Sequence, residues 1–323
     1  MLGFVARRLA FAAVTVVAVV LVTFVLVHAA PGLPMLGGPE RRLASPETLA
    51  RQRALFGLDR PLPEQLLRYA TNLAHGQLGE SFVLHRPVAE VLGEALPRTL
   101  LLGGVALALS LLLGLAAGVT QAARHRSGAD TALGIATLVA YSVPVFWLGL
   151  VLLMTFGEWL HWLPVGGMTS ATADELGPGG RALDVARHLV LPAVTLALVQ
   201  AAAFARFQRG ALVETLAMPY VRSARARGLP ERAVLLRHAL RGALAPTITL
   251  AGLSVPYFLA GSVFVESMYG WPGLGRVAYD AIFARDYNVI TGTALVAGLL
   301  VVLGNLLADV ALAALDPRVR LDR

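Results

Sequence analysis

Six stretches of the chain are almost free of charged side chains and are long enough, or nearly so, to cross a membrane. An α-helix rises 1.5 Å per residue, so about 20 residues span roughly 30 Å of hydrocarbon. The stretches run from Leu9 to about Ala30, Thr99 to Ala123, Thr131 to Gly157, His188 to Ala205, Gly242 to Val265 and Tyr287 to Ala308. The fourth is the weakest, because it is short and carries His188 and Gln200. The pattern predicts an all-α polytopic membrane protein with six transmembrane helices.

The arginines between these stretches predict the orientation. Arg7 and Arg8 precede the first stretch, and Arg124 and Arg126 separate the second from the third. The connection between the fourth and fifth stretches, residues 206–241, carries Arg206, Arg209, Arg222, Arg225, Arg227, Arg232, Arg237 and Arg241. Placing these eight in hydrocarbon at about 2.5 kcal/mol each would cost roughly 20 kcal/mol, so this connection lies outside the membrane. Because basic residues in short connections stay on the cytoplasmic side, both termini are expected there.

The remaining connections divide the chain further. Residues 1–30 are expected to be a retained membrane helix; a cleavable signal peptide is the alternative, but the apolar run is too long for one. Residues 31–98 form a long external segment in which Pro46 to Leu55 and Pro63 to Leu73 have helical spacing. Residues 99–315 form the transmembrane core, and residues 316–323 a short polar cytoplasmic tail.

Composition supports a membrane protein and excludes some chemistry. Hydrophobic residues make up 57% of the chain and charged residues 15%, and the mean hydropathy is +0.69. There is no cysteine, and all 27 basic residues are arginine. Since a phosphate-binding P-loop needs a lysine, any ATP that drives this protein must bind to another chain. The net charge of +7 is explained by cytoplasmic arginines, so nucleic acid is not an expected partner.

Residues 214–241 have the pattern of a helix, a break and a second helix. Tyr220, Val221 and Ala224 can share one helical face. Gly228 can adopt the positive φ that ends a helix, and Pro230 suits the first turn of the next one. Such a short rigid element with small residues at its apex fits a groove on a partner protein. The plainer alternative is that its arginines only fix topology and bind anionic lipid head groups.

An ordered set of motifs resembles one known family over almost the whole chain. The strongest is Ala224-Arg225-Ala226-Arg227-Gly228-Leu229, followed by His238-Ala239-Leu240-Arg241 and Ala245-Pro246. The others are Arg7-Arg8, Pro31-Gly32, Gly57-Leu58-Asp59-Arg60-Pro61, Leu78-Gly79-Glu80-Ser81, Tyr141 to Trp147, Trp271 to Arg276 and Asp316-Pro317-Arg318. Together they resemble the permeases of the dipeptide, oligopeptide and nickel ABC importers, with Leu33 a departure from an acidic residue that is common after Pro-Gly.

The resemblance implies a type I ABC importer permease fold, an assembly and a role for residues 206–241. This connection would be the EAA loop that docks into an ATPase subunit, and the docking residues would be Arg222, Ala224, Arg225, Ala226, Arg227, Gly228 and Leu229. Implied partners are a second homologous permease, two ABC ATPases that bind Mg-ATP, an extracytoplasmic substrate-binding protein and the lipid of a prokaryotic cytoplasmic membrane. Peptides are the first expectation for the substrate, and nickel or another small solute is the alternative.

Two further groups of residues are candidates for transport. Tyr141, Pro144, Phe146, Trp147 and Pro256 could line the translocation path, although kinks and burial against another helix explain them as well. Glu266, Trp271, Gly273, Gly275 and Arg276 could dock the binding protein, or could form an interfacial aromatic turn. Asp309 lies close to the membrane interface, where pairing in a structural role explains this carboxylate as well as a role in transport does.

An ion-coupled secondary transporter is the main rival, but the central stretches offer almost no titratable groups. No catalytic or metal-binding motif is evident, so the chain is expected not to be an enzyme.

Overall fold

The computed structural model describes the backbone of residues 2–29, 47 and 59–315. Within these ranges, the side chains of residues 2–12, 28, 74, 256–257, 259–261 and 308–315 are not described. The turn at Pro31-Gly32, the predicted helix from Pro46 to Leu55 apart from residue 47, and the tail 316–323 therefore lie outside the described residues. So do the side chains of Arg7, Arg8, Pro256 and Asp309.

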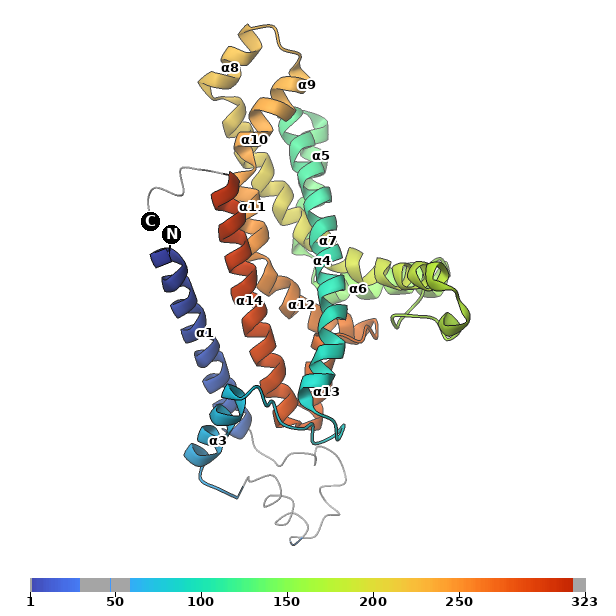
Figure 1. The fold of residues 1–323 in the computed structure, drawn as a ribbon. Coiled ribbons are helices and arrows are strands. Elements are labelled where there is room, and N and C mark those ends of the chain that lie inside the picture. Colours follow the sequence, from blue (N-terminus) through green and yellow to red (C-terminus); the bar gives the residue numbers. More distant parts are fainter. Residues whose placement is uncertain (1, 30–46, 48–58, 316–323) are drawn as a thin grey trace. The chain divides into compact units, whose positions relative to one another are not determined.

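The described residues fall into two compact units, and their regular structure is helical (Figure 1). The first unit, residues 1–98 and 273–299, contains α1 (Leu2–Ala29), α3 (Leu62–Ala74), α13 (Leu274–Ala284) and the first parts of α4 (Val88–Ala123) and α14 (Tyr287–Leu315). The second unit, residues 99–272 and 300–323, contains the rest of α4 and α14 and all other elements. These are α5 (Gly128–Ser142), α6 (Val145–Leu152), η2 (Leu153–Trp159), η3 (Ala173–Glu175), α7 (Pro178–Leu216), α8 (Pro219–Ala226), α9 (Glu231–Ala233), η4 (Val234–Ala239), α10 (Leu240–Ala243), α11 (Ala245–Leu253) and α12 (Val255–Met268).

Each of the six apolar stretches is helical, but not each is one helix. By length and composition, three helices among the described residues can cross a membrane: α4, α7 and residues 287–307 of α14. A bent pair, residues 128–142 and 145–159, makes a fourth if it is counted as one span. Within α1, residues Ala13–Val27 form a shorter apolar helix, and the fifth stretch is divided among α10, α11 and α12. The prediction of an all-α protein with apolar helices is confirmed for these residues, whereas the number of six spans stays a prediction.

The third stretch bends sharply where the sequence places a proline. Val143 and Pro144 have extended backbone, with ψ angles of 128° and 133°, and the helices on either side meet at 103°. Proline disfavours helical geometry at the residue before it and donates no hydrogen bond, so the helix ends at Ser142. Figure 1 shows α6 turning away from α5 at this point. The third expected span, 131–157, is therefore not one straight helix.

The fourth stretch is only the middle of a much longer helix. α7 has 39 residues, from Pro178 to Leu216, whereas the apolar run covers residues 188–205. The helix therefore extends into both connections that the sequence analysis placed outside the membrane. Its last turns carry Arg209 and lead directly to α8.

α7 packs against α4 through small residues. A Cβ built on Gly114 would lie 2.8 Å from the carbonyl oxygen of Ala201, and one built on Gly118 would lie 2.7 Å from that of Ala205. Both distances are shorter than ordinary van der Waals contacts, so only glycine allows this approach. The G-x-x-x-G spacing puts both glycines on one face of α4, as in many membrane helix pairs.

In the first unit, a buried aspartate joins two segments that are far apart in the sequence. Asp286 precedes α14 and accepts a hydrogen bond from the backbone N–H of Val289 at 3.3 Å, which caps the helix. The same side chain accepts hydrogen bonds from the hydroxyl of Ser81 and from the N–H of Val83. Phe82 packs nearby with Val27 and Tyr287 in a small apolar cluster. Asp286 thus ties residues 81–83 to the start of α14.

Candidate functional site

The predicted helix, break and second helix are present, and we call residues 219–243 the hairpin. α8 ends at Ala226, and Gly228 has a φ of +78° while its N–H donates to the carbonyl of Arg225 at 2.9 Å. This is the left-handed conformation that favours glycine. Pro230 has extended backbone and precedes α9, which continues as the π-helical segment η4 and then as α10. The prediction that Gly228 and Pro230 divide two helices is confirmed.

An apolar cluster holds the hairpin to the ends of α4 and α7. Val221 and Ala224 of α8 pack with Val234 from the second arm, with Ala122 of α4 and with Leu212 of α7. Four of the five, Val221, Ala224, Val234 and Leu212, are fully buried. Burial of this kind is the main stabilising term for a short helix, which is marginal alone in water. The hairpin is therefore a packed extension of α7.

An ion pair closes the apex of the hairpin. Arg225 donates to both carboxylate oxygens of Glu231, with Nη2 2.6 Å from Oε1 and Nε 3.1 Å from Oε2. These hydrogen bonds hold the pKa of the Glu231 carboxyl below its ordinary value. Both side chains are well exposed, so the pair contributes little to stability. It does restrain the two arms on either side of Gly228.

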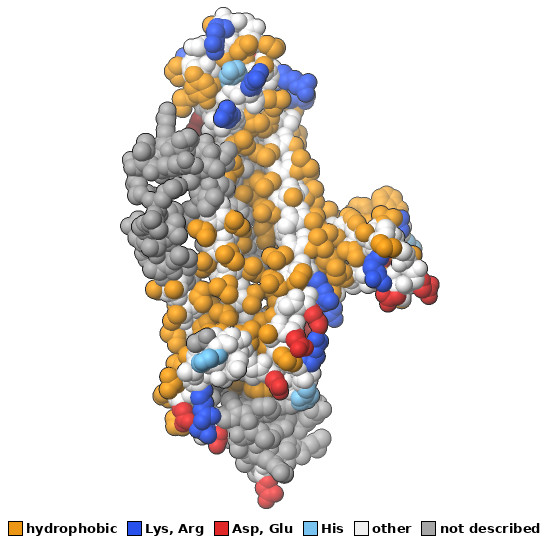
Figure 2. Space-filling view, in the orientation of Figure 1, with side chains coloured by type: hydrophobic (Ala, Val, Ile, Leu, Met, Phe, Trp, Pro, Cys, Tyr) orange, Lys and Arg blue, Asp and Glu red, His pale blue; other side chains and the backbone are white. Residues whose placement is uncertain are grey.

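Six of the seven expected docking residues are exposed, and one is not. Ala224 is fully buried in the apolar cluster, so its side chain faces inward rather than toward a partner. The exposed residues are Arg222, Arg225, Ala226, Arg227, Gly228 and Leu229. Tyr220 was expected on the same face as Val221 and Ala224, but it is 48% exposed. Figure 2 shows arginines over the hairpin, at the top of the view, and hydrophobic side chains along the helices below it.

Four of the five candidate path residues lie around the bend between α5 and α6, and the fifth, Pro256, is in α12. Tyr141, Phe146 and Trp147 are each at least half exposed on this chain, and Pro144 is exposed at the break itself. The side chain of Pro256 is outside the described residues. The guanidinium of Arg206, on α7, lies 5.4 Å from the ring centroid of Tyr141 in a cation–π arrangement.

The candidate docking residues for the binding protein are mostly buried. Glu266 and Trp271 are fully buried, and Glu266 accepts a hydrogen bond from the hydroxyl of Thr99 at 2.7 Å. Gly273 and Gly275 are buried as well, whereas Arg276 is exposed and lies 3.8 Å from Asp280. In this structure the side chains of Glu266 and Trp271 lie in the protein interior, and of the five residues only Arg276 has an exposed side chain.

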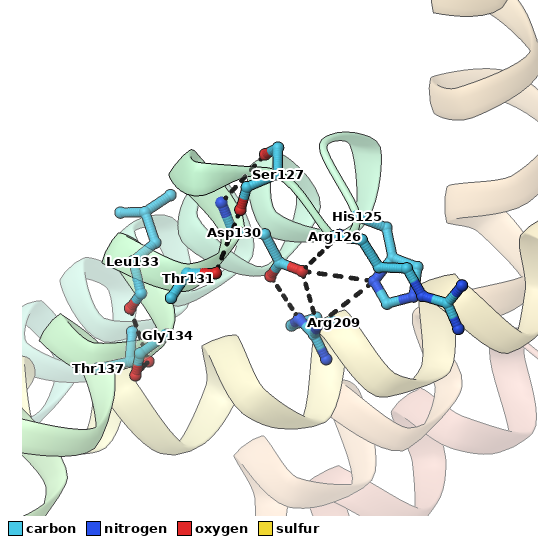
Figure 3. Close-up of polar contacts among 9 residues, drawn as sticks. All are labelled: His125, Arg126, Ser127, Asp130, Thr131, Leu133, Gly134, Thr137 and Arg209. Carbon is cyan, nitrogen blue, oxygen red and sulfur yellow. Dashed lines mark hydrogen bonds and ion pairs between the residues drawn. The ribbon is translucent and has the colours of Figure 1, made fainter.

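Sequence reasoning missed a buried ion pair beside the hairpin (Figure 3). Asp130, in the first turn of α5, is only 7% exposed. Arg209 of α7 donates to both of its oxygens, with Nε 2.7 Å from Oδ1 and Nη2 2.8 Å from Oδ2. His125 Nδ1 lies 3.4 Å from Oδ2 of Asp130 and 3.4 Å from Nη2 of Arg209.

One local signal for this cluster was present in the sequence. Ser127 and Asp130 have the S-x-x-D spacing of a helix start, and the hydroxyl of Ser127 accepts a hydrogen bond from the N–H of Asp130 at 3.3 Å. The spacing could have identified the beginning of α5. It gave no indication of Arg209, which is 79 residues further along the chain.

Apolar helices of membrane-spanning length define the class as a polytopic membrane protein, and this one carries an exposed arginine-rich hairpin. Residues 110–321 match the family described as binding-protein-dependent transport system inner membrane component, and residues 1–103 match the N-terminal part of such membrane components. The chain belongs to this family. It is therefore a multi-pass inner membrane permease, a transport subunit without catalytic activity that functions with a binding protein and ATPase partners.

Similar proteins cover the chain from end to end. The di/tripeptide transport system permease protein DppB of Pseudomonas aeruginosa (strain UCBPP-PA14) is 39% identical over 336 residues, covering 100% of both chains. The dipeptide transport system permease protein DppB of Escherichia coli (strain K12) is 37% identical over 339 residues, covering 99% of each. The oligopeptide transport system permease protein AppB of Bacillus subtilis (strain 168) is 36% identical over 322 residues, again covering 99% of each.

Proposed function

We propose that this chain forms half of the pore of an ATP-driven peptide importer and that the hairpin receives the movement of an ATPase subunit. The observation that carries the coupling role is the exposed apex around Gly228, which is held on the packed end of α7. Its arginines can pair with acidic groups on a partner, and its small residues allow close approach. The second half of the pore would be a homologous permease, and two ATPase subunits would bind Mg-ATP.

Peptides are the proposed substrate class. The three relatives described above carry names of dipeptide, di/tripeptide and oligopeptide permeases and align over their whole lengths. Nickel or another small solute is the alternative from the wider family. An ion-coupled secondary transporter is disfavoured, because the family consists of the permeases of binding-protein-dependent ABC transporters, which function with ATPase partners.

The proposed membrane arrangement has six spans with the hairpin and both termini in the cytoplasm. The eight arginines of residues 206–241 support this orientation, since such residues stay on the cytoplasmic side. The third and fifth spans would be broken helices, with their breaks near Pro144 and around Ser254. Broken helices are tolerated in membranes where they face protein or a water-filled path, so both breaks support the expectation that Tyr141, Pro144, Phe146, Trp147 and Pro256 line the pore.

The coupling role can be tested at Gly228 with a control for backbone strain. A Cβ built at Gly228 meets nothing within 4 Å, so the position has open space for the first atom of a side chain. Gly76 has nearly the same φ, +74°, and its Cβ also meets nothing within 4 Å. Gly228→Val and Gly76→Val therefore carry a similar strain of about 1–2 kcal/mol or more.

With the transporter in proteoliposomes, we expect Gly228→Val to abolish peptide uptake and the stimulation of ATP hydrolysis by the loaded binding protein. Insertion into the membrane should be unchanged, and Gly76→Val should retain transport. Normal uptake by Gly228→Val would refute the coupling role.

The substrate class is tested separately by calorimetric binding of dipeptides, longer peptides and nickel to the cognate binding protein. Binding of nickel alone would refute the peptide assignment.

A further inference from the structure

The carboxylate of Asp130 accepts hydrogen bonds from two structural elements, the turn before α5 and the helix α7. The backbone N–H of Arg126, a residue with a φ of +63°, donates to Oδ2 of Asp130 at 3.0 Å, so the carboxylate closes the turn between α4 and α5. The guanidinium of Arg209 binds both oxygens of the same carboxylate from α7. Figure 3 shows the arginine facing the carboxylate across the two helices. Any displacement of α7 at this level therefore acts directly on the first turn of α5.

The geometry of this ion pair makes the link directional. A bidentate pair between arginine and a carboxylate fixes the relative orientation of the two groups as well as their distance. The Asp130 side chain is 7% exposed and that of Arg209 is 36% exposed, so water competes weakly for the carboxylate. An exposed pair at the start of the same helix, Arg181 with Asp174, has a single contact of 2.7 Å and lacks these features. The two pairs differ in burial and in geometry.

On one side, the ion pair is next to the hairpin. Arg209 lies about two turns before the end of α7, and Leu212, one turn further, is buried in the cluster that contains Val221 and Ala224 of α8. The end of α4 contributes Ala122 to the same cluster. A force applied to α8 is therefore applied to the part of α7 that carries Arg209.

On the other side, the helix α5 connects the ion pair to the bend at Pro144. α5 begins beside Asp130 and ends at Ser142, directly before the break at Pro144. Arg206, one turn before Arg209 on α7, lies over the ring of Tyr141 near the end of α5. Two arginines of α7 thus contact α5 close to its beginning and close to its end. α5 is expected to move with α7 as one body.

We propose that Asp130 and Arg209 are positioning residues that transmit movement of the hairpin to α5, and through α5 to the path residues at the bend. The inference rests on the proposed function, because it takes the hairpin as the point at which the ATPase acts. It adds the link between that point and the pore. In this role the pair serves coupling, beyond its contribution to folding.

The test uses the assembled transporter, purified through a tag on this chain and reconstituted with its binding protein and a dipeptide. The readouts are copurification of the ATPase subunits, peptide uptake, and the ratio of ATP hydrolysis with loaded binding protein to hydrolysis without it. Arg209→Lys retains the charge but loses the two-point geometry, and Asp130→Asn removes the charge. For both variants we expect the ATPase subunits to copurify, while uptake and the stimulation ratio fall about five-fold or more. Arg181→Gln, which breaks the exposed pair on the same helix, should change none of the three readouts.

A double variant separates coupling from folding. Asp130→Asn combined with Arg209→Gln leaves no unpaired buried charge, so it should assemble even if a single variant does not. If the double variant assembles and remains uncoupled, the proposal stands. If it recovers full stimulation, or if Arg209→Lys and Asp130→Asn retain uptake, the pair is structural only and the proposal is overturned. If the ATPase subunits fail to copurify with the unchanged chain, it is the proposed function that has failed.

Discussion

Replacing Gly118 by alanine should destabilise the protein, although the same substitution at Gly104, also in α4, should not. The Cβ of an alanine at this position would lie 2.7 Å from the carbonyl oxygen of Ala205, 2.9 Å from Cβ of Gln208 and 3.1 Å from the nitrogen of Arg209. Non-bonded heavy atoms prefer about 3.5–4.0 Å, so α4 and α7 would have to separate locally by about 0.8 Å. A gap of that size forfeits a quarter to a half of each affected contact.

The magnitude follows from two opposing terms. Overpacking of a close helix contact costs about 1–3 kcal/mol, whereas replacing glycine by alanine inside a helix gains about 1 kcal/mol. Gly104, on the same helix, has nothing within 4 Å of its built Cβ, so Gly104→Ala should show only the stabilisation that comes from the higher helix propensity of alanine. The gain in helix propensity is common to both variants, so it cancels when they are compared. Gly118→Ala should therefore have a free energy of unfolding about 1–3 kcal/mol below that of Gly104→Ala.

The assay is thermal unfolding of each purified variant in detergent, with intrinsic tryptophan fluorescence as the signal. We expect Gly118→Ala to melt below the unchanged protein and Gly104→Ala to melt at or above it. A melting temperature of Gly118→Ala that equals or exceeds that of Gly104→Ala would show that α4 and α7 do not approach as closely as the structure has them. The reasoning on the G-x-x-x-G face would then be wrong.

Three other substitutions test separate features of the structure. Asp286→Ala removes the cap of α14 and leaves the buried hydroxyl of Ser81 without its acceptor, so it should lower stability by about 2 kcal/mol or more, measured by the same thermal unfolding. Tyr269→Phe removes a buried hydroxyl that donates to the carbonyl of Gly149 at 2.9 Å; we expect a loss of about 1–3 kcal/mol, and the exposed Tyr279→Phe should be nearly neutral. Pro144→Ala should let α5 and α6 approach one continuous helix, which would increase the spin-label distance between positions 131 and 158, whereas an unchanged distance would show that packing alone holds the 103° bend.

Local patterns in the sequence were enough for the elements that local rules govern. The apolar stretches predicted helices in the right places because burying a helix in lipid depends on about 20 consecutive residues. Gly228 and Pro230 predicted the division of the hairpin because their backbone preferences are intrinsic to those two residue types. The helix predicted from Pro63 to Leu73 is α3, Leu62–Ala74, for the same reason.

Tertiary structure decided what depends on partners far apart in the chain. The buried positions of Glu266 and Trp271 could not be read from a segment that is rich in glycine and aromatic residues, since burial depends on which helices pack around it. The inward direction of Ala224 was set by the cluster with Leu212 and Val234. Likewise the apolar run of residues 188–205 did not reveal that α7 extends from Pro178 to Leu216.

By itself, the sequence determined a helical membrane protein with an arginine-rich hairpin, because hydrophobic length, arginine placement and the Gly-Leu-Pro break each act within one segment; the permease function was implied only by the resemblance of its ordered motifs to a known family. Only the fold brought Asp130 to Arg209 across 79 residues and matched Gly118 of α4 to the backbone of α7. Such contacts are determined by the packing of whole helices, and no local propensity specifies the partner of a buried charge or the neighbour of a glycine.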